Sequence, residues 1–127
     1  MQIFRHFPQQ LTPQALAIGN FDGMHLGHQA LLQQLVTYAH THGITPAVMT
    51  FEPHPREFFT PQQAPARLAS MREKLEFFAD SGIAHVYVQR FDHAFAAQTP
   101  DHFMHCLRSQ LHANVVMVGE DFCFGAK

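Results

Sequence analysis

Residues 14–28 read Q-A-L-A-I-G-N-F-D-G-M-H-L-G-H, a short apolar segment that runs through a glycine-rich turn into a helical pattern. The segment 14–19 predicts a strand that ends at Gly19. From Gln29 onward, apolar side chains recur at the spacing of an amphipathic helix, and Gly43 follows as a stop signal. The apolar positions of this helix are Leu31, Leu32, Leu35, Val36 and Ala39.

The same alternation continues along the chain. Residues 46–52 (P-A-V-M-T-F-E) predict a second strand, and their almost continuous apolar character is typical of a strand covered on both faces. Residues 84–89 (A-H-V-Y-V-Q) and 114–119 (N-V-V-M-V-G) predict a third and a fourth strand. Helical connections between short apolar strands predict an α/β fold with a parallel sheet and right-handed crossovers.

The second and third helices carry clear start signals. Ser70 and Glu73 form a capping box, and Gly82 ends the helix that follows. Its expected buried residues are Met71, Leu75 and Phe78. Thr99 and Pro100 are placed as N-cap and first residue of another helix. The expected inner face of that helix consists of Phe103, Leu107 and Leu111.

Composition excludes several classes of protein. The chain has 127 residues, which fits one domain, and 8 basic against 10 acidic residues, which argues against a strongly basic nucleic-acid binder. A hydrophobic content of 46% with 13 Phe excludes disorder as the general state. No apolar run approaches the roughly 20 residues of a membrane span, and the start lacks the apolar core of a secretory signal. Two cysteines make no disulfide framework, so we expect a cytoplasmic protein without a membrane partner.

Two features concern the organisation of the chain. Residues 53–69 contain four prolines and form the longest irregular stretch, which predicts a lid or a binding loop. The sequence stops eight residues after the predicted fourth strand, with no further helix. We therefore expect residues 1–127 to be part of a longer protein, and the alternative is a complete four-stranded domain.

The turn after the first strand carries the chemistry. In open α/β sheets, ligands bind beyond the carboxyl ends of the strands, where a helix N-terminus offers free N–H groups to an anion. Gly19, Gly23 and Gly27 permit tight turning and close approach of the backbone to a phosphate. His25 and His28 are three residues apart in the first helical turn, so both imidazoles are expected to reach one anion.

Other interpretations of this turn stay open. A zinc site on His25 and His28 needs a third ligand, for which Asp22 is the candidate, but a helix N-terminus favours anions over cations. The turn can also be a structural glycine-rich turn with polar residues at a helix start. The remaining histidines show no ligand spacing, so no metal site is predicted. The pattern is neither the G-x-G-x-x-G fingerprint nor a P-loop.

At these residues the sequence resembles the bacterial FAD synthetases, the bifunctional riboflavin kinase/FMN adenylyltransferases. The resemblance is to their N-terminal adenylyltransferase domain, a Rossmann-like member of the H-x-G-H nucleotidyltransferase superfamily. The matching stretches are G-N-F-D-G-M-H-L-G-H-Q-A-L-L (19–32), T-F-E-P-H-P-R-E-F-F (50–59), A-P-A-R-L (64–68), R-F-D-H-A-F-A (90–96) and V-G-E-D-F-C-F-G (118–125).

The resemblance implies transfer of AMP from ATP to FMN, giving FAD and pyrophosphate, with Mg²⁺ carried by the nucleotide. His25 and His28 are then the catalytic residues. The implied ATP and phosphate site consists of Gly19, Asn20, Phe21, Asp22, Gly23 and Gly27. The implied flavin site consists of His54, Pro55, Phe58, Asp121, Phe122 and Phe124. The partners are these small molecules, and the oligomeric state is left open.

The sequence departs from the family pattern at several points. The family's later phosphate-binding motif and its riboflavin kinase domain have no counterpart in residues 1–127. Ala69 stands where the family often has Thr, and Cys123 occupies a variable or basic position. Two alternatives therefore remain: a flavin- or nucleotide-binding fragment without turnover, and an H-x-G-H nucleotidyltransferase with another acceptor.

Overall fold

The fold is a three-layer α/β structure around a parallel sheet. A computed structural model describes residues 1–10, 12–22, 26–52 and 70–119. The strands are β1 (Gln2–Phe4), β2 (Gln14–Ile18), β3 (Thr45–Glu52), β4 (His85–Arg90) and β5 (Ala113–Val118). The helices are α1 (Leu26–His42), α3 (Met71–Asp80), α4 (His93–Ala96) and α5 (Pro100–Ser109). The predicted α/β fold with a parallel sheet is confirmed.

The described sheet has five strands in the order β1-β4-β3-β2-β5, one strand more than the sequence predicts. The additional strand, β1, pairs with β4 through only three residues, beginning with Gln2 opposite His85. Three residues are too few to display strand alternation, so this strand has no signal of its own in the sequence. The short helix α4, capped by the Asp92 side chain on the Phe95 N–H, was also not predicted.

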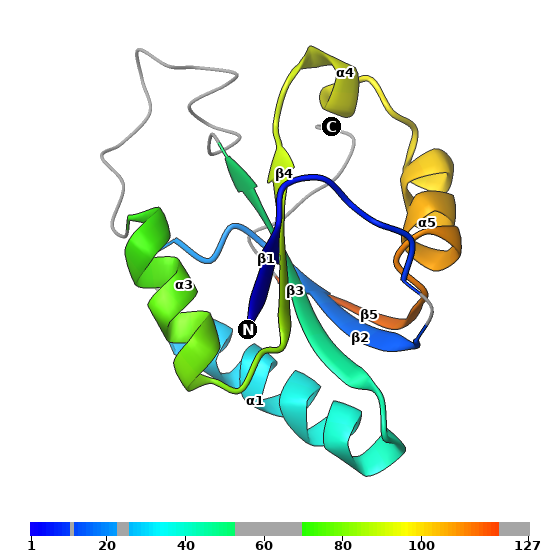
Figure 1. Cartoon of the computed structure of the whole chain (residues 1–127). Coiled ribbons are helices and arrows are strands. Elements are labelled where there is room, and N and C mark those ends of the chain that lie inside the picture. Colours follow the sequence, from blue (N-terminus) through cyan, green and yellow to red (C-terminus); the bar gives the residue numbers. More distant parts are fainter. Residues whose placement is uncertain (11, 23–25, 53–69, 120–127) are drawn as a thin grey trace.

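Crossover direction distributes the helices over the two faces of the sheet. The chain moves from β2 through α1 to β3 and through α3 to β4, then returns past β2 to β5. Right-handed crossovers in opposite directions place their helices on opposite faces. Figure 1 accordingly shows α1 and α3 on one face of the sheet and α5 on the other.

Strand β2 has a core on each side. All five of its residues are buried. Leu16 and Ile18 belong to the cluster under α5, while Ala15 and Ala17 belong to the cluster under α1 and α3. Alternate side chains of a strand point to opposite faces, so the apolar run of β2 is what a strand covered on both faces requires.

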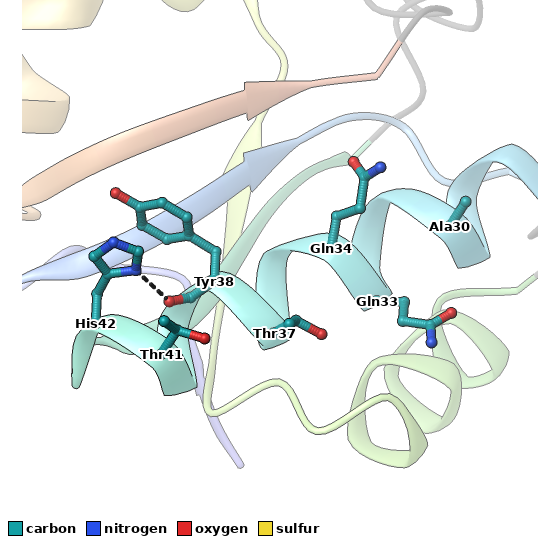
Figure 2. A pocket seen from close by; sticks show the side chains of 7 residues that line it. All are labelled: Ala30, Gln33, Gln34, Thr37, Tyr38, Thr41 and His42. Carbon is teal, nitrogen blue, oxygen red and sulfur yellow. Dashed lines mark hydrogen bonds between the residues drawn. The ribbon is translucent and has the colours of Figure 1, made fainter.

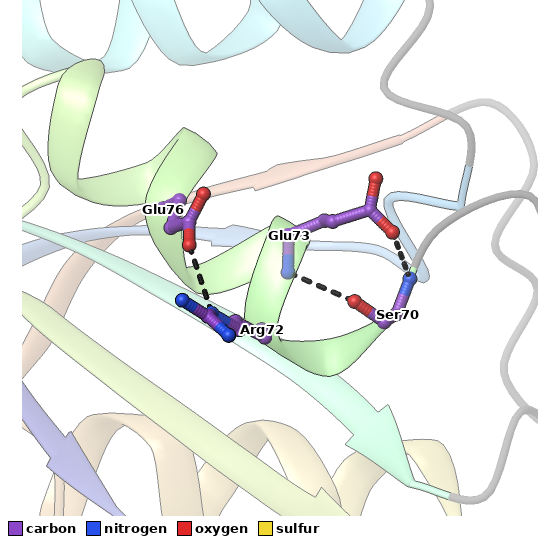
Figure 3. Close-up of polar contacts among 4 residues, drawn as sticks. All are labelled: Ser70, Arg72, Glu73 and Glu76. Carbon is purple, nitrogen blue, oxygen red and sulfur yellow. Dashed lines mark hydrogen bonds and ion pairs between the residues drawn. The ribbon is translucent and has the colours of Figure 1, made fainter.

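The predicted capping signals are confirmed. Figure 3 shows the Ser70 hydroxyl accepting from the Glu73 N–H at 3.1 Å, while the Glu73 carboxylate accepts from the Ser70 N–H at 3.1 Å. Thr99 caps α5 by accepting from the His102 N–H at 3.1 Å, with Pro100 as the first helical residue.

The buried face of α3 differs from the prediction. Phe78 is buried as expected, but Met71 and Leu75 are only partly buried and pack at the margin of the core. Lys74 is the second buried residue of the helix. A hydrophobic pattern assigns lysine to the surface by default, so this position was missed. In α5, Phe103 and Leu107 are buried as predicted, and Leu111 is buried just beyond the helix.

A polar network lies at the end of the sheet where β2 and β4 begin. The Gln14 amide donates to Tyr87 Oη at 2.8 Å and to the Leu111 carbonyl at 2.6 Å, and its Oε1 lies 2.8 Å from His85 Nδ1. Burial raises the pKa of Tyr87, against the opposing effect of hydrogen bonds with Gln14 and Gln10. Burial also lowers the pKa of His85, followed by the charge of the N-terminal amine. These shifts favour the neutral forms, so the network holds the strands without a buried charge.

We expect Ser70→Ala to lower the free energy of unfolding by about 1 kcal/mol, because the Glu73 N–H in the first turn of α3 loses the hydroxyl that accepts its hydrogen bond. Urea denaturation followed by circular dichroism measures this change. Arg72→Ala is the matched control. Arg72 and Glu76 form an exposed i, i+4 pair at 3.2 Å, and its loss should cost about 0.5 kcal/mol or less. Equal effects of the two substitutions would contradict the capping assignment.

Candidate functional site

The carboxyl edge of the sheet brings three chain segments together. The Gly19 N–H donates to the Met49 carbonyl at 3.2 Å, and the Gly119 N–H donates to the Ile18 carbonyl at 2.9 Å. The chain leaves β2 toward β3 and returns to β5 on the other side, so the strand order reverses between β2 and β5. This is the switch point at which open α/β sheets bind ligands.

The turn after β2 is fixed by the packing of Phe21. This side chain is fully buried and has a φ of +54°, a left-handed conformation that is uncommon for a bulky residue. A Cβ atom at Gly19 would lie 3.2 Å from Phe21 Cε2. Gly19 therefore leaves room for the Phe21 ring, which is a packing role that the sequence did not reveal.

Phe21 connects the core to His28. Its ring packs edge-on against Phe78 of α3 with 5.2 Å between centroids, and it is tilted against the His28 ring at 5.1 Å. His28 is the third residue of α1 and is only 3% exposed. Its ring is thus held at the beginning of the helix, where unpaired N–H groups of a first turn point outward.

Asn20 and Thr50 supply buried polar groups at the same edge. The Thr50 hydroxyl donates to the Asn20 carbonyl at 3.2 Å, which ties the turn to β3. Asn20 is 6% exposed, and its Oδ1 has no hydrogen-bond partner within the described part of the chain. A buried acceptor of this kind calls for an explanation such as a bound ligand or water.

The structure describes six of the fourteen residues of the predicted site. Asp22 is half-buried beside the turn, and Gly27 is exposed in the first turn of α1. The predictions for Gly23, His25, His54, Pro55, Phe58, Asp121, Phe122 and Phe124 lie outside the described residues. The joint reach of His25 and His28, the zinc alternative and the flavin site therefore remain predictions. Over the described ranges, no group of three His, Cys, Asp or Glu side chains has the arrangement of a metal site.

A further buried polar residue is Lys74 of α3, the helix whose Phe78 packs on Phe21. It is 2% exposed and precedes Phe78 by one helical turn. Sequence patterns assign lysine to the surface by default. The one hint of a special role is weak: Lys74 lies near a helix N-terminus, where a cation is unfavourable.

A surface hollow along α1 is a separate feature. Figure 2 shows this hollow, about 560 Å³ in volume, along the exposed side of the helix. Its lining consists of Ala30, Gln33, Gln34, Thr37, Tyr38, Thr41 and His42. Tyr38 and His42 stack at 3.9 Å, and His42 Nδ1 lies 2.9 Å from the Tyr38 carbonyl, so this pair completes the last helical turn. All of the lining comes from one helix, whereas ligand sites usually combine groups from several elements.

Comparison with known proteins identifies relatives over nearly the whole chain. A family model described as FAD synthetase matches residues 7–127. The bifunctional riboflavin kinase/FMN adenylyltransferase of Escherichia coli K12 is 46% identical over 112 residues, which cover 87% of this chain and 36% of that protein. The protein of the same name from Haemophilus influenzae is 43% identical over 114 residues, covering 89% of this chain and 37% of the relative. The chain thus spans little more than a third of the length of these curated relatives.

A solved structure has the same fold. The crystal structure of a macrolide-efflux protein from Streptococcus pneumoniae superposes with a TM-score of 0.74 at 23% identity, over 92% of this chain and 40% of that chain. At this level of identity the similarity concerns the fold alone. None of the described helices has the length and apolar character that crossing a membrane requires.

We expect Gly19→Ala to lower the free energy of unfolding by about 1–3 kcal/mol, because the added Cβ presses on a ring that cannot move away. Combining it with Phe21→Leu should cost less than the sum of the two single changes, since both act on one contact. Gly27→Ala is the matched control, as an exposed helical position where alanine is tolerated or favoured. Chemical denaturation of the four variants measures these energies, and strict additivity would exclude the proposed contact.

Proposed function

Because this chain belongs to the FAD synthetase family, we propose that the protein transfers the adenylyl group of ATP to FMN, giving FAD and pyrophosphate. In the longer protein that its relatives represent, the same polypeptide also phosphorylates riboflavin. The names of the Escherichia coli and Haemophilus influenzae relatives support both activities. The proposed location of the protein is the cytoplasm.

The observation that carries the proposal is the position of His28. It lies in the first turn of α1, directly beyond the carboxyl end of β2, and its ring packs against a core residue. A phosphate in front of this turn would meet the free N–H groups and the positive end of the helix dipole. An imidazole that is already fixed there stabilises charge without reorganisation during the reaction.

The chemistry that follows is a single in-line displacement. An oxygen of the FMN phosphate attacks the α-phosphorus of ATP, the new P–O bond forms, and the bond to the leaving pyrophosphate breaks. In this proposal His28 and His25 donate hydrogen bonds to the phosphoryl oxygens while charge moves to the leaving group. No covalent enzyme intermediate is needed, so the protein acts through positioning and charge stabilisation.

The residues proposed to bind the substrates are those that the sequence resemblance implies. The phosphates of ATP lie against residues 19–23 and Gly27. The residues proposed to contact the flavin are His54, Pro55, Phe58, Asp121, Phe122 and Phe124. A Mg²⁺ ion held by the phosphates of ATP would supply charge neutralisation, because oxygen ligands from substrate phosphates suit this ion.

Direct measurement of FAD formation tests the proposed reaction. The protein, with any polypeptide that follows residue 127, is incubated with ATP, FMN and Mg²⁺, and FAD is separated by chromatography. CTP and other phosphorylated acceptors serve as competing substrates. Exclusive transfer to another acceptor would refute the FMN assignment. A polypeptide of residues 1–127 alone is expected to bind nucleotide weakly and to form little FAD, because several groups must clamp one triphosphate.

We expect His28→Ala to reduce the rate of adenylyl transfer on the order of 100-fold while FMN affinity changes little, the usual loss for one preorganised donor. His28→Phe keeps a ring beside Phe21 and should lose as much activity with less loss of stability. His40→Ala, an exposed position near the other end of α1, is the control and should retain full activity. Normal turnover in both His28 variants would remove this residue from the mechanism.

A further inference from the structure

We propose that Lys74 is a further binding residue of this site, and that its ammonium group contacts a phosphate of the bound nucleotide or flavin. The inference deepens the proposed function and rests on it for the identity of the ligand. Nothing in the sequence resemblance pointed to this residue. The inference rests on the burial of Lys74, on its position in α3 and on the residues around that position.

Lys74 differs from the other cations of the described chain in its burial. It is 2% exposed, whereas the side chains of Arg5, Arg72 and Arg90 are 60%, 89% and 83% exposed. A buried ammonium loses its hydration and persists only where anionic or polar groups replace the water. An interaction within the chain already engages Lys74. Because an ammonium has three N–H donors, a phosphate can be an additional partner.

The position of Lys74 along α3 makes a purely structural role costly. It is the fourth residue of the helix, next to Glu73, which completes the capping box. The positive end of the helix dipole opposes a cation in this turn. Burial and the dipole therefore both act against lysine here, and a bound dianion or trianion would relieve both. The positive end of the α3 dipole then also attracts the bound anion.

Packing places Lys74 on the side of α3 that faces the site. Residues four apart lie on one face of a helix, so Lys74 shares the face of Phe78. Phe78 packs on Phe21, which in turn packs on His28. Helical side chains lean toward the N-terminus, so we expect Lys74 to extend beyond Phe78 toward the end of the sheet where β2 ends and α1 begins.

The distribution of buried polar residues agrees with this placement. Asn20, His28, Thr50 and Lys74 are four of the five buried polar side chains of the described residues. The fifth, Gln14, lies at the opposite edge, where its amide is fully bonded to the protein. Asn20 Oδ1, in contrast, has no hydrogen-bond partner among the described residues. The Asn20 side chain is therefore available to a bound molecule, whereas Gln14 is used entirely within the protein.

Two substitutions separate binding from structure. Lys74→Met keeps the length and apolar stem of the side chain and removes the charge, while Lys74→Arg keeps a charge. Arg72→Met, on the exposed side of the same helical turn, is the control. Calorimetry measures the affinities of the full-length protein for ATP and adenosine, and for FMN and riboflavin, and thermal unfolding is recorded for each variant.

Lys74→Met is expected to weaken binding of one phosphate-bearing ligand by about 10- to 100-fold, as for loss of a charged hydrogen bond. Adenosine and riboflavin should bind as before, Lys74→Arg should recover part of the affinity, and Arg72→Met should behave as wild type. A loss of affinity confined to ATP assigns the Lys74 contact to the nucleotide phosphates. A loss confined to FMN assigns it to the flavin phosphate.

Two outcomes would overturn the inference. Unchanged affinity for ATP and FMN in Lys74→Met removes the residue from the binding site. An equal loss for all four ligands, together with a lower unfolding temperature, shows a structural role instead. If the wild-type protein forms no FAD while the Lys74 effect on phosphate binding persists, the proposed reaction fails and this binding assignment stands.

Discussion

The two-sided burial of β2 is the constraint on which the rest of the structure depends. This strand is hydrogen-bonded to β3 on one edge and to β5 on the other, and both of its faces are covered. A central strand with no exposed side chain requires helices on both faces of the sheet. Right-handed crossovers satisfy this requirement only if the chain leaves β2 in one direction and returns on the other side.

The reversal of the strand order between β2 and β5 also creates the candidate site. Strands on the two sides of a switch point send their connections to opposite faces, which leaves the carboxyl end of β2 uncovered by either connection. The turn at residues 19–22 and the first turn of α1 occupy this place. The position of the candidate phosphate-binding turn is therefore a consequence of how the core is covered.

Phe21 links the close-packed core to the candidate site. Its ring is enclosed by Phe78 and His28 and lies against the backbone of Gly19. Close packing of this kind leaves little freedom for the imidazole or for the turn. A histidine held in this way is suited to electrostatic stabilisation, which depends on groups that do not need to reorganise. The sequence resemblance includes Phe21 among the nucleotide-binding residues, and because its side chain is buried in the core, any contact with a nucleotide would come from its backbone.

The sequence by itself determined the elements that local signals encode. Apolar runs predicted β2 to β5. Two helix starts were predicted from capping residues, Ser70 with Glu73 and Thr99 with Pro100. Gly43 predicted the end of α1, and in the structure its φ is +65°. The motif at residues 19–28 predicted the phosphate-binding turn, because glycines and histidines at a strand–helix junction have few structural reasons to occur together. Only the tertiary structure decided what depends on contacts between distant residues. The three residues of β1 form a strand because β4 offers them partners, and Gly19 is required because the Phe21 ring passes close to it. Lys74 is buried on the face of α3 where Phe78 packs against the core, and a pattern that assigns every lysine to the surface does not predict this.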